Sequence, residues 1–221
     1  MSSYERRRLG QVLLAGGVVV SLAGLVAELA RALGSAPLEW VSLFSLSYEA
    51  NLPTWYATVL LFSSSASLAQ IARSAGAHRA RWWMLSAIFL YMSADEASEI
   101  HEHAGGLVDG TGVLYFSWVV PAAVVVLALG LFYLPFIRAL PSPLRGRVIL
   151  AGALYVGGAL GMELPLGWWT EQHGDEGLGY ALIDHVEESL ELAGASVFLW
   201  ALRARIAEPG PVRPGAAEQG A

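Results

Sequence analysis

Residues 95–103 have the residue types and the spacing of a metal site. Four carboxylates and two imidazoles occupy these nine positions, and they follow the apolar run WWMLSAIFLYM. Carboxylate oxygens and neutral imidazole nitrogens together suit zinc, iron or manganese. The segment therefore predicts ligands for a divalent metal ion at the end of an apolar helix.

A second segment, DHVEESLELAG at 184–194, repeats the pattern of DEASEIHEHAG at 95–105. Both contain D-x3-E-x2-E-x-A-G, and the spacing i, i+4, i+7 places the three acids on one face of a helix. In antiparallel helices these faces would bring Glu99 opposite Glu188. The match indicates either an inverted repeat of a three-helix unit or two helices that converged on one ligand pattern.

A third helix supplies Glu163, inside the apolar stretch GGALGMELPLGWW. We expect the three segments to pack together around one ion. His101 can join the site only where its helix ends or bends, because on an ideal helix it points away from Asp95. Glu96 and Glu187, at the edges of the acidic faces, are expected to orient ligands or carry protons. The candidate metal ligands are Asp95, Glu99, His101, Glu102, His103, Glu163, Asp184, His185, Glu188 and Glu191.

These acids need a counter-charge, because a carboxylate at the centre of a bilayer costs roughly 2.5–3.5 kcal/mol. Arg31 is the only lysine or arginine at this level, and Glu28 is its i, i+3 neighbour. Three sources of compensation remain: a metal ion, protons shared among the carboxylates, or solvation at an outer rim. The histidines favour the metal ion. Solvation does not account for Glu163 and Glu191, which have apolar sequence around them.

The elements that position these residues are apolar segments long enough to cross a membrane. The chain of 221 residues is 55% hydrophobic and 14% charged, whereas a soluble domain carries about a quarter charged residues. With no cysteine, disulfides and thiolate metal ligands are excluded. The fold class is therefore an all-α polytopic membrane bundle. Its six transmembrane helices are predicted at 10–33, 54–76, 82–104, 113–137, 147–168 and 180–202.

Arginine sets the predicted orientation. All 13 arginines except Arg31 lie at span ends that would share one side of the membrane. The positive-inside rule predicts that this side, with both termini, faces the cytoplasm. The predicted location is the inner membrane of a bacterium. Residues 1–205 would form the six-span domain and residues 206–221, rich in Pro and Gly, a disordered cytoplasmic tail. The lipid bilayer is the expected partner, nucleic acid is not, and the oligomeric state stays open.

The order of several motifs resembles a family of uncharacterised bacterial multipass membrane proteins. The motifs are EANLPTWY at 49–56, SADEASEIHEH at 93–103, a glutamate in the fifth span and EESLELAG at 187–194. The resemblance covers spans two to six and brings no activity with it. It singles out Asp95, Glu96, His101, Glu102, Glu187, Glu188 and Glu191. A fainter similarity to ceramidase-like membrane hydrolases rests on Glu49 and Asn51, which would support the ligands, but the His-x3-His pair and the seventh span of those enzymes are missing.

Two function classes fit these features. The first is a metal-dependent membrane enzyme that acts on a lipid or other amphiphile from the outer leaflet. The second is a transporter of divalent cations or a proton-coupled carrier, which needs a polar path to the other side. Residues 148–158 and 195–202 are nearly without polar groups, and only SSSASLAQ at 63–70 offers a partial path, so the enzyme is favoured. A third possibility is a non-catalytic subunit whose acidic network holds helices together. The GxxxG spacing of Gly157 and Gly161 indicates close helix packing.

Overall fold

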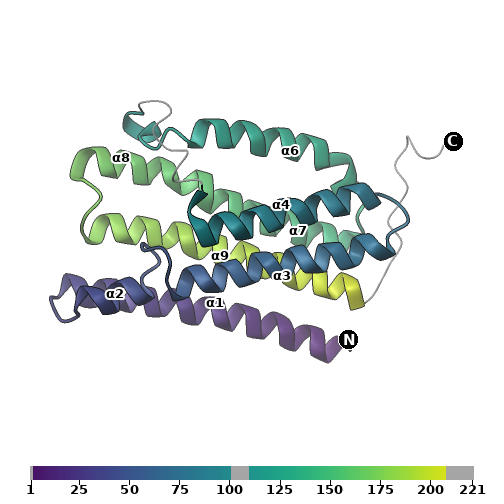
Figure 1. Cartoon of the computed structure of the whole chain (residues 1–221), viewed down its shortest axis with the longest axis horizontal. Helices are drawn as coiled ribbons and strands as arrows, with labels where there is room; N and C mark the ends of the chain where they lie inside the picture. Colours follow the sequence, from purple (N-terminus) through teal and green to yellow (C-terminus); the bar gives the residue numbers. More distant parts are fainter. Residues whose placement is uncertain (1, 101–109, 208–221) are drawn as a thin grey trace.

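The computed structural model describes residues 2–100 and 110–207, and this part of the chain is helical and contains no strand (Figure 1). The all-α fold class is confirmed. A 3-10 turn (Gly112–Leu114) precedes α6, and a π-helical turn (Gly157–Met162) joins α7 to α8. The α-helices are α1 (Ser3–Ala32), α2 (Leu38–Phe44), α3 (Leu52–Ser74), α4 (Arg79–Ser98), α6 (Val119–Ala139), α7 (Ser142–Val156), α8 (Glu163–His173) and α9 (Leu178–Ala207).

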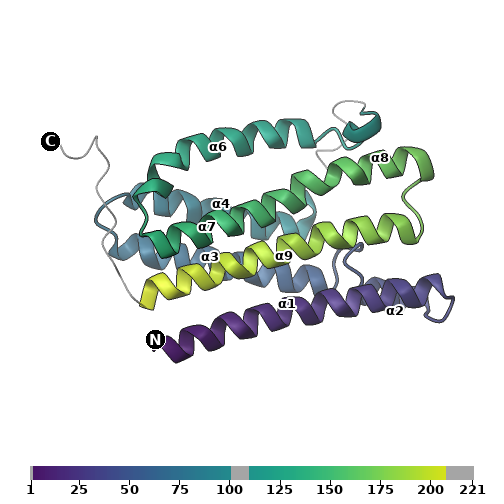
Figure 2. The same ribbon diagram turned by 180° about the vertical axis from the view of Figure 1, so that it is seen from behind.

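The long helices run up and down along one axis, and α1 begins at the end of the bundle where α9 ends (Figures 1 and 2). α9 is the central helix, because α1, α3, α7 and α8 all pack against it. Except for Arg31 in the last turn of α1, the arginines of the helices gather at this end of the bundle, where α3 and α6 also end. Most of the acids lie at the opposite end, where α9 begins. Charge is therefore separated along the bundle axis, as the sequence indicates.

The two N-terminal caps that hold the first long helices are readable in the sequence. The backbone N–H of Ser2 donates to the Glu5 carboxylate at 2.6 Å, and Ser2 Oγ accepts from the N–H of Glu5, so the pair forms a capping box for α1. Asn51 Oδ1 accepts from the N–H of Thr54 at 3.1 Å and caps α3. These caps determine where α1 and α3 begin.

Helix α4 ends earlier than predicted. The predicted span reaches residue 104, but α4 stops at Ser98 and Glu99 adopts the left-handed conformation with φ 53°. The N–H of Glu99 still donates to the carbonyl of Asp95 at 2.7 Å, which closes the last turn. A left-handed residue then turns the chain out of the helix, because it cannot continue right-handed helical geometry. Over the described residues, the two acidic motifs therefore do not form equivalent helices.

Three described helical segments are long and apolar enough to cross a membrane, rather than the six predicted. They are Arg7–Ala32, Val119–Ala139 and Ser142–His173, the last of which joins α7, the π turn and α8. Their apolar side chains lie largely on the surface; Val19 and Leu127, for example, are 65% and 63% exposed. Such extended apolar surface is typical of contact with lipid. Helices α3, α4 and α9, with 23, 20 and 30 residues, are long enough, but serines and charged residues make them less apolar than the other three segments.

Close helix packing is made by glycines other than the predicted pair. A Cβ atom on Gly157 or Gly161 would meet no atom within 4 Å, whereas one on Gly158 would lie 2.7 Å from the carbonyl oxygen of Glu187. A Cβ on Gly194 would lie 2.7 Å from the backbone nitrogen of Tyr155. The π turn has wider hydrogen-bonded rings than an α-helix, so it changes which face of the segment meets α9. α-Helical spacing therefore gives the wrong glycines.

Two apolar clusters fill the bundle away from the acidic end. The first includes Leu60 and Leu192, and the second, nearer the arginines, includes Trp82, Phe136 and Leu202. All five side chains are at most 2% exposed. Buried, close-packed apolar clusters of this kind exclude water from the arginine half of the bundle.

Two serines of α3, Ser65 and Ser67, and Ser86 of α4 form hydrogen bonds with helix backbone. Ser65 Oγ donates to the carbonyl of Ser86 on α4 at 2.8 Å, and Ser86 Oγ donates to the carbonyl of Ser65 at 2.9 Å. Ser67 Oγ donates to the carbonyl of Ser63 on its own helix at 2.7 Å. Such bonds satisfy hydroxyl groups within helices, so these three serines are engaged in helix contacts.

Candidate functional site

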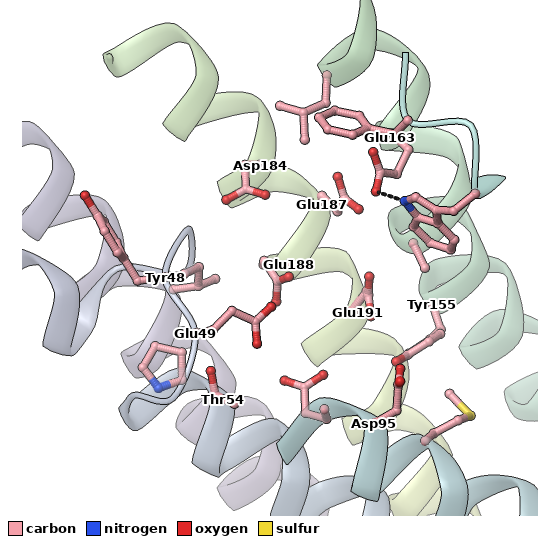
Figure 3. A pocket seen from close by; sticks show the side chains of 18 of the residues that line it. Tyr48, Glu49, Thr54, Asp95, Tyr155, Glu163, Asp184, Glu187, Glu188 and Glu191 are labelled. Carbon is pink, nitrogen blue, oxygen red and sulfur yellow. Dashed lines mark hydrogen bonds between the residues drawn. The ribbon is translucent and has the colours of Figure 1, made fainter. Parts of the chain in front are cut away.

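A cavity of about 480 Å³ lies at the end of the bundle where α9 begins. Its walls come from the loop before α3, the start of α3, the end of α4, the segment from α7 to α8 and the first half of α9 (Figure 3). No arginine or histidine belongs to the described lining. Eight acids line the cavity: Glu49, Asp95, Glu96, Glu163, Asp184, Glu187, Glu188 and Glu191.

One face of α9 provides half of these acids. Asp184, Glu187, Glu188 and Glu191 follow one another at i, i+3, i+4 and i+7, the spacing of a single helix face. Glu187, expected only at the edge of this face, is part of the wall and is 7% exposed. Tyr180 continues the same face one turn earlier, so its position could have been found from the helical spacing alone.

The π turn presents a second face to the cavity. Tyr155, Ala159 and Glu163 all line it, and the Tyr155 side chain lies beside Glu191 (Figure 3). Glu163 is 9% exposed and accepts a hydrogen bond from the indole Nε1–H of Trp118 at 3.1 Å. Sequence reasoning missed Trp118, because it precedes α6 and has no spacing relation to the acids. The structure thus joins the start of α6 to the cavity wall.

Glu188 lines the cavity, but Glu99, its predicted partner, takes another position. Glu99 does not line the cavity, since α4 ends before it and its backbone is left-handed. Asp95 and Glu96, in the last turn of α4, line the cavity instead, and Glu49 reaches it from the loop before α3 (Figure 3). The other predicted ligands of this segment, His101, Glu102 and His103, lie outside the described residues.

His185, predicted to be a metal ligand, is not among the residues that line the cavity. Its Nε2 atom lies 3.5 Å from Ser189 Oγ, and Ser189 in turn donates to Ser21 Oγ of α1 at 3.1 Å. The reason is helical rotation of about 100° per residue. Since Asp184 faces the cavity, the next residue turns toward α1. Its Nδ1 atom is buried and has no hydrogen-bond partner among the described residues.

Asn51 holds the loop that carries Glu49. Its Nδ2 group lies 3.0, 2.7 and 2.7 Å from the carbonyl oxygens of Ser42, Ser45 and Tyr48. Together with the cap on Thr54, these contacts connect α2, the loop and α3. Asn51 thus contacts the backbone of the loop, whereas Glu49 itself lines the cavity.

Arg31 contacts the lining residue Tyr48 but is engaged with groups other than the cavity acids. Its Nε atom lies 3.8 Å from Glu28 Oε2, and its Nη1 donates to the Tyr48 hydroxyl at 2.7 Å. Glu28 is 2% exposed and also accepts a hydrogen bond from Ser45 Oγ. Arg31 therefore compensates Glu28, not the cavity acids.

The described residues form no assembled metal centre: nowhere among them do three or more His, Asp or Glu side chains gather closely enough to hold an ion. The physical reason is that the acids are distributed around a cavity of about 480 Å³, and His185 lies on another face. Buried oxygens nevertheless face this space. Asp184 Oδ2 and Glu187 Oε2 are buried without a hydrogen-bond partner in the described part of the chain. Such a wall can accept cations or hydrogen-bond donors.

The fold and this cavity define an all-helical protein, compatible with a membrane location, whose bundle encloses a cluster of acids at one end. The chain belongs to a family that is described as a domain of unknown function (DUF8692), whose model matches residues 6–206. Membership of an uncharacterised family, implied by the motifs, is confirmed at that level. No curated protein and no solved structure matches the chain.

Proposed function

We propose that this protein is a six-helix membrane protein that binds a divalent cation in the acidic cavity and uses it in chemistry on a lipid or other amphiphile. One observation carries the proposal: eight acids line one cavity whose described wall has no basic side chain. The four of these acids on α9, Asp184, Glu187, Glu188 and Glu191, face one space at this depth, which would be strongly unfavourable without compensation of their charge. A bound cation removes that cost.

Length supports the crossing of the membrane by α3, α4 and α9. A helix of 20 residues, the length of α4, reaches about 30 Å, the thickness of the hydrocarbon core. These helices run beside the three apolar segments over the same distance (Figures 1 and 2). The arginine end would face the cytoplasm, with the cavity near the outer surface of the bacterial inner membrane.

Labelling of single cysteines tests this orientation. A membrane-impermeant thiol reagent added to intact cells should label Ser35→Cys, beyond the end of α1, and should not label Ser74→Cys at the arginine end. Both positions are exposed, and the chain has no cysteine of its own. The reverse pattern would contradict the proposed depth of the cavity.

The described ligand set bears on the identity of the cation. Because His185 does not line the cavity, the charged ligands that the described wall offers are carboxylates, beside the thioether of Met92. Of zinc, iron and manganese, a carboxylate set favours manganese, whereas imidazole and thiolate favour the other two. A bound divalent cation would polarise an oxygen atom of a headgroup and so promote its reaction.

An enzyme is favoured over a carrier by the rest of the cavity and by the core. Phe116, Leu166 and Met92 line the cavity together with the acids, so an amphiphile finds both polar and apolar surface there. The buried cluster around Trp82 and Phe136 closes the bundle toward the arginine end. A carrier needs a polar route through that half.

Cation binding by the purified protein is the direct test. Titration with Mn²⁺, followed by elemental analysis after desalting, should show a bound ion in the wild type. Glu188→Gln keeps the size of a side chain in the cavity wall and removes its charge, so we expect binding to weaken by more than about tenfold. Glu171→Gln is the matched control, because Glu171 is exposed on α8 and does not line the cavity.

Equal binding by the two variants, or none by the wild type, would overturn the cation site. The same protein reconstituted in vesicles separates the two functions. Mn²⁺ flux that depends on Glu188 would identify a carrier, whereas binding without flux supports an enzyme.

A further inference from the structure

We propose that a groove at the arginine end binds the headgroup of an anionic phospholipid. The groove is a cavity of about 430 Å³ whose lining comes from the start of α1, the start of α7 and the end of α9. α9 forms its floor, with α1 on one side and α7 on the other (Figure 2). It lies at the opposite end of the bundle from the acidic cavity, so the two proposals are independent.

Two arginines give the groove a positive charge. Arg7 of α1 and Arg147 of α7 both line it, and no acid of residues 2–100 or 110–207 does. The guanidinium carbon of Arg147 lies 4.3 Å from the centre of the Trp200 ring, a cation–π contact that fixes the position of the charge. The nearby Glu5 is engaged in the capping box with Ser2. The guanidinium groups of Arg7 and Arg147 therefore share a described lining that contains no carboxylate. Such a lining suits a phosphate group.

Gly10 makes the groove possible. A Cβ atom there would lie 2.9 Å from Trp200 Nε1, so only a glycine lets the indole lie against α1. The flat ring then forms part of the groove next to Arg147. An indole beside a cation is typical of the interface between lipid and water, where the ring contacts both.

The apolar part of the lining favours a lipid over a soluble anion. Leu14 and Val197 line the groove beyond the arginines, and Leu14 is 58% exposed. This surface continues into the exposed apolar side chains of α1, such as Val18, at 48% exposed. A phosphate held by the arginines would therefore leave an acyl chain along apolar surface. Basic pockets between membrane helices on the cytoplasmic side have this lipid preference.

Native mass spectrometry and thermal unfolding of the detergent-solubilised full chain test the assignment. The probes are dioleoyl-phosphatidylglycerol, dioleoyl-phosphatidylcholine and inorganic phosphate. Of these three probes, we expect only phosphatidylglycerol to remain bound and to raise the melting temperature of the protein. Arg147→Gln should weaken its binding about fivefold, the effect of one basic residue at an anionic surface. Arg145→Gln is the matched control, since Arg145 donates to the carbonyl of Arg138 and does not line the groove.

Arg7→Gln provides a second variant that tests the charge without disturbing packing, because Arg7 is exposed. We expect it also to weaken binding of phosphatidylglycerol. Equal stabilisation by phosphatidylcholine would show an unspecific lipid effect, and equal stabilisation by inorganic phosphate would show a site for soluble anions. Either result, or unchanged binding in both lining variants, would overturn the proposal. None of these readouts depends on the acidic cavity.

Discussion

Addition of a chelator to the protein purified with its cation should lower the melting temperature by about 5–10 °C. Binding to the folded state at 100 times the dissociation constant stabilises it by about 2.7 kcal/mol, and a chain of this size shifts by about 2–4 °C per kcal/mol. The structural basis is the face of α9 that presents Asp184, Glu187, Glu188 and Glu191 to one cavity. Without a cation these carboxylates repel one another. Differential scanning fluorimetry with and without chelator measures the shift.

The chelation experiment also distinguishes the cation from shared protons as the counter-charge. Glu188→Gln should have a lower melting temperature in excess cation than the wild type, and it should respond less to the chelator. If protons compensate the acids, the chelator has no effect and Glu188→Gln is neutral or stabilising. Stability then falls as pH rises, because the folded state holds protons that it loses at high pH. That pattern would remove the cation from the proposed function.

Replacement of Asn51 with alanine should destabilise the protein by about 2–4 kcal/mol. The substitution removes the cap on the N–H of Thr54, which is worth about 0.5–2 kcal/mol. It also leaves the carbonyl groups of Ser42, Ser45 and Tyr48 without the amide that now lies 2.7–3.0 Å away, and an unsatisfied buried group costs about 1–3 kcal/mol. Chemical or thermal unfolding in detergent measures the change.

Two further variants separate the parts of this effect. Asn51→Asp keeps an acceptor for the cap but places an anionic oxygen against the three carbonyl groups, so we expect it to lose at least as much stability as Asn51→Ala. Ser42→Ala is the control, because the Ser42 hydroxyl donates only to the carbonyl of Glu39 on its own helix. Since Asn51 holds the loop that carries Glu49, Asn51→Ala should weaken cation binding as well. If Asn51→Ala were as stable as Ser42→Ala, the loop would be held by contacts other than those of Asn51.

Several features of the protein follow from the sequence alone. The apolar segments determine that the chain is helical, because this signal acts within a short stretch of sequence. Helical spacing likewise determines that Asp184, Glu188 and Glu191 share a face. The placement of acids at one end and arginines at the other follows from the alternation of helix direction.

Only the tertiary structure decided which side chains meet. Glu99 lies outside the cavity lining because α4 ends in a left-handed residue, and the face of α9 that carries His185 and Ser189 meets α1. The π turn makes Gly158, not Gly157, the point of contact with α9 and brings Tyr155 to the cavity. These outcomes depend on contacts between helices that are distant in the chain. A periodic pattern describes one helix at a time, so it determines the face of a helix but not the partner which that face meets.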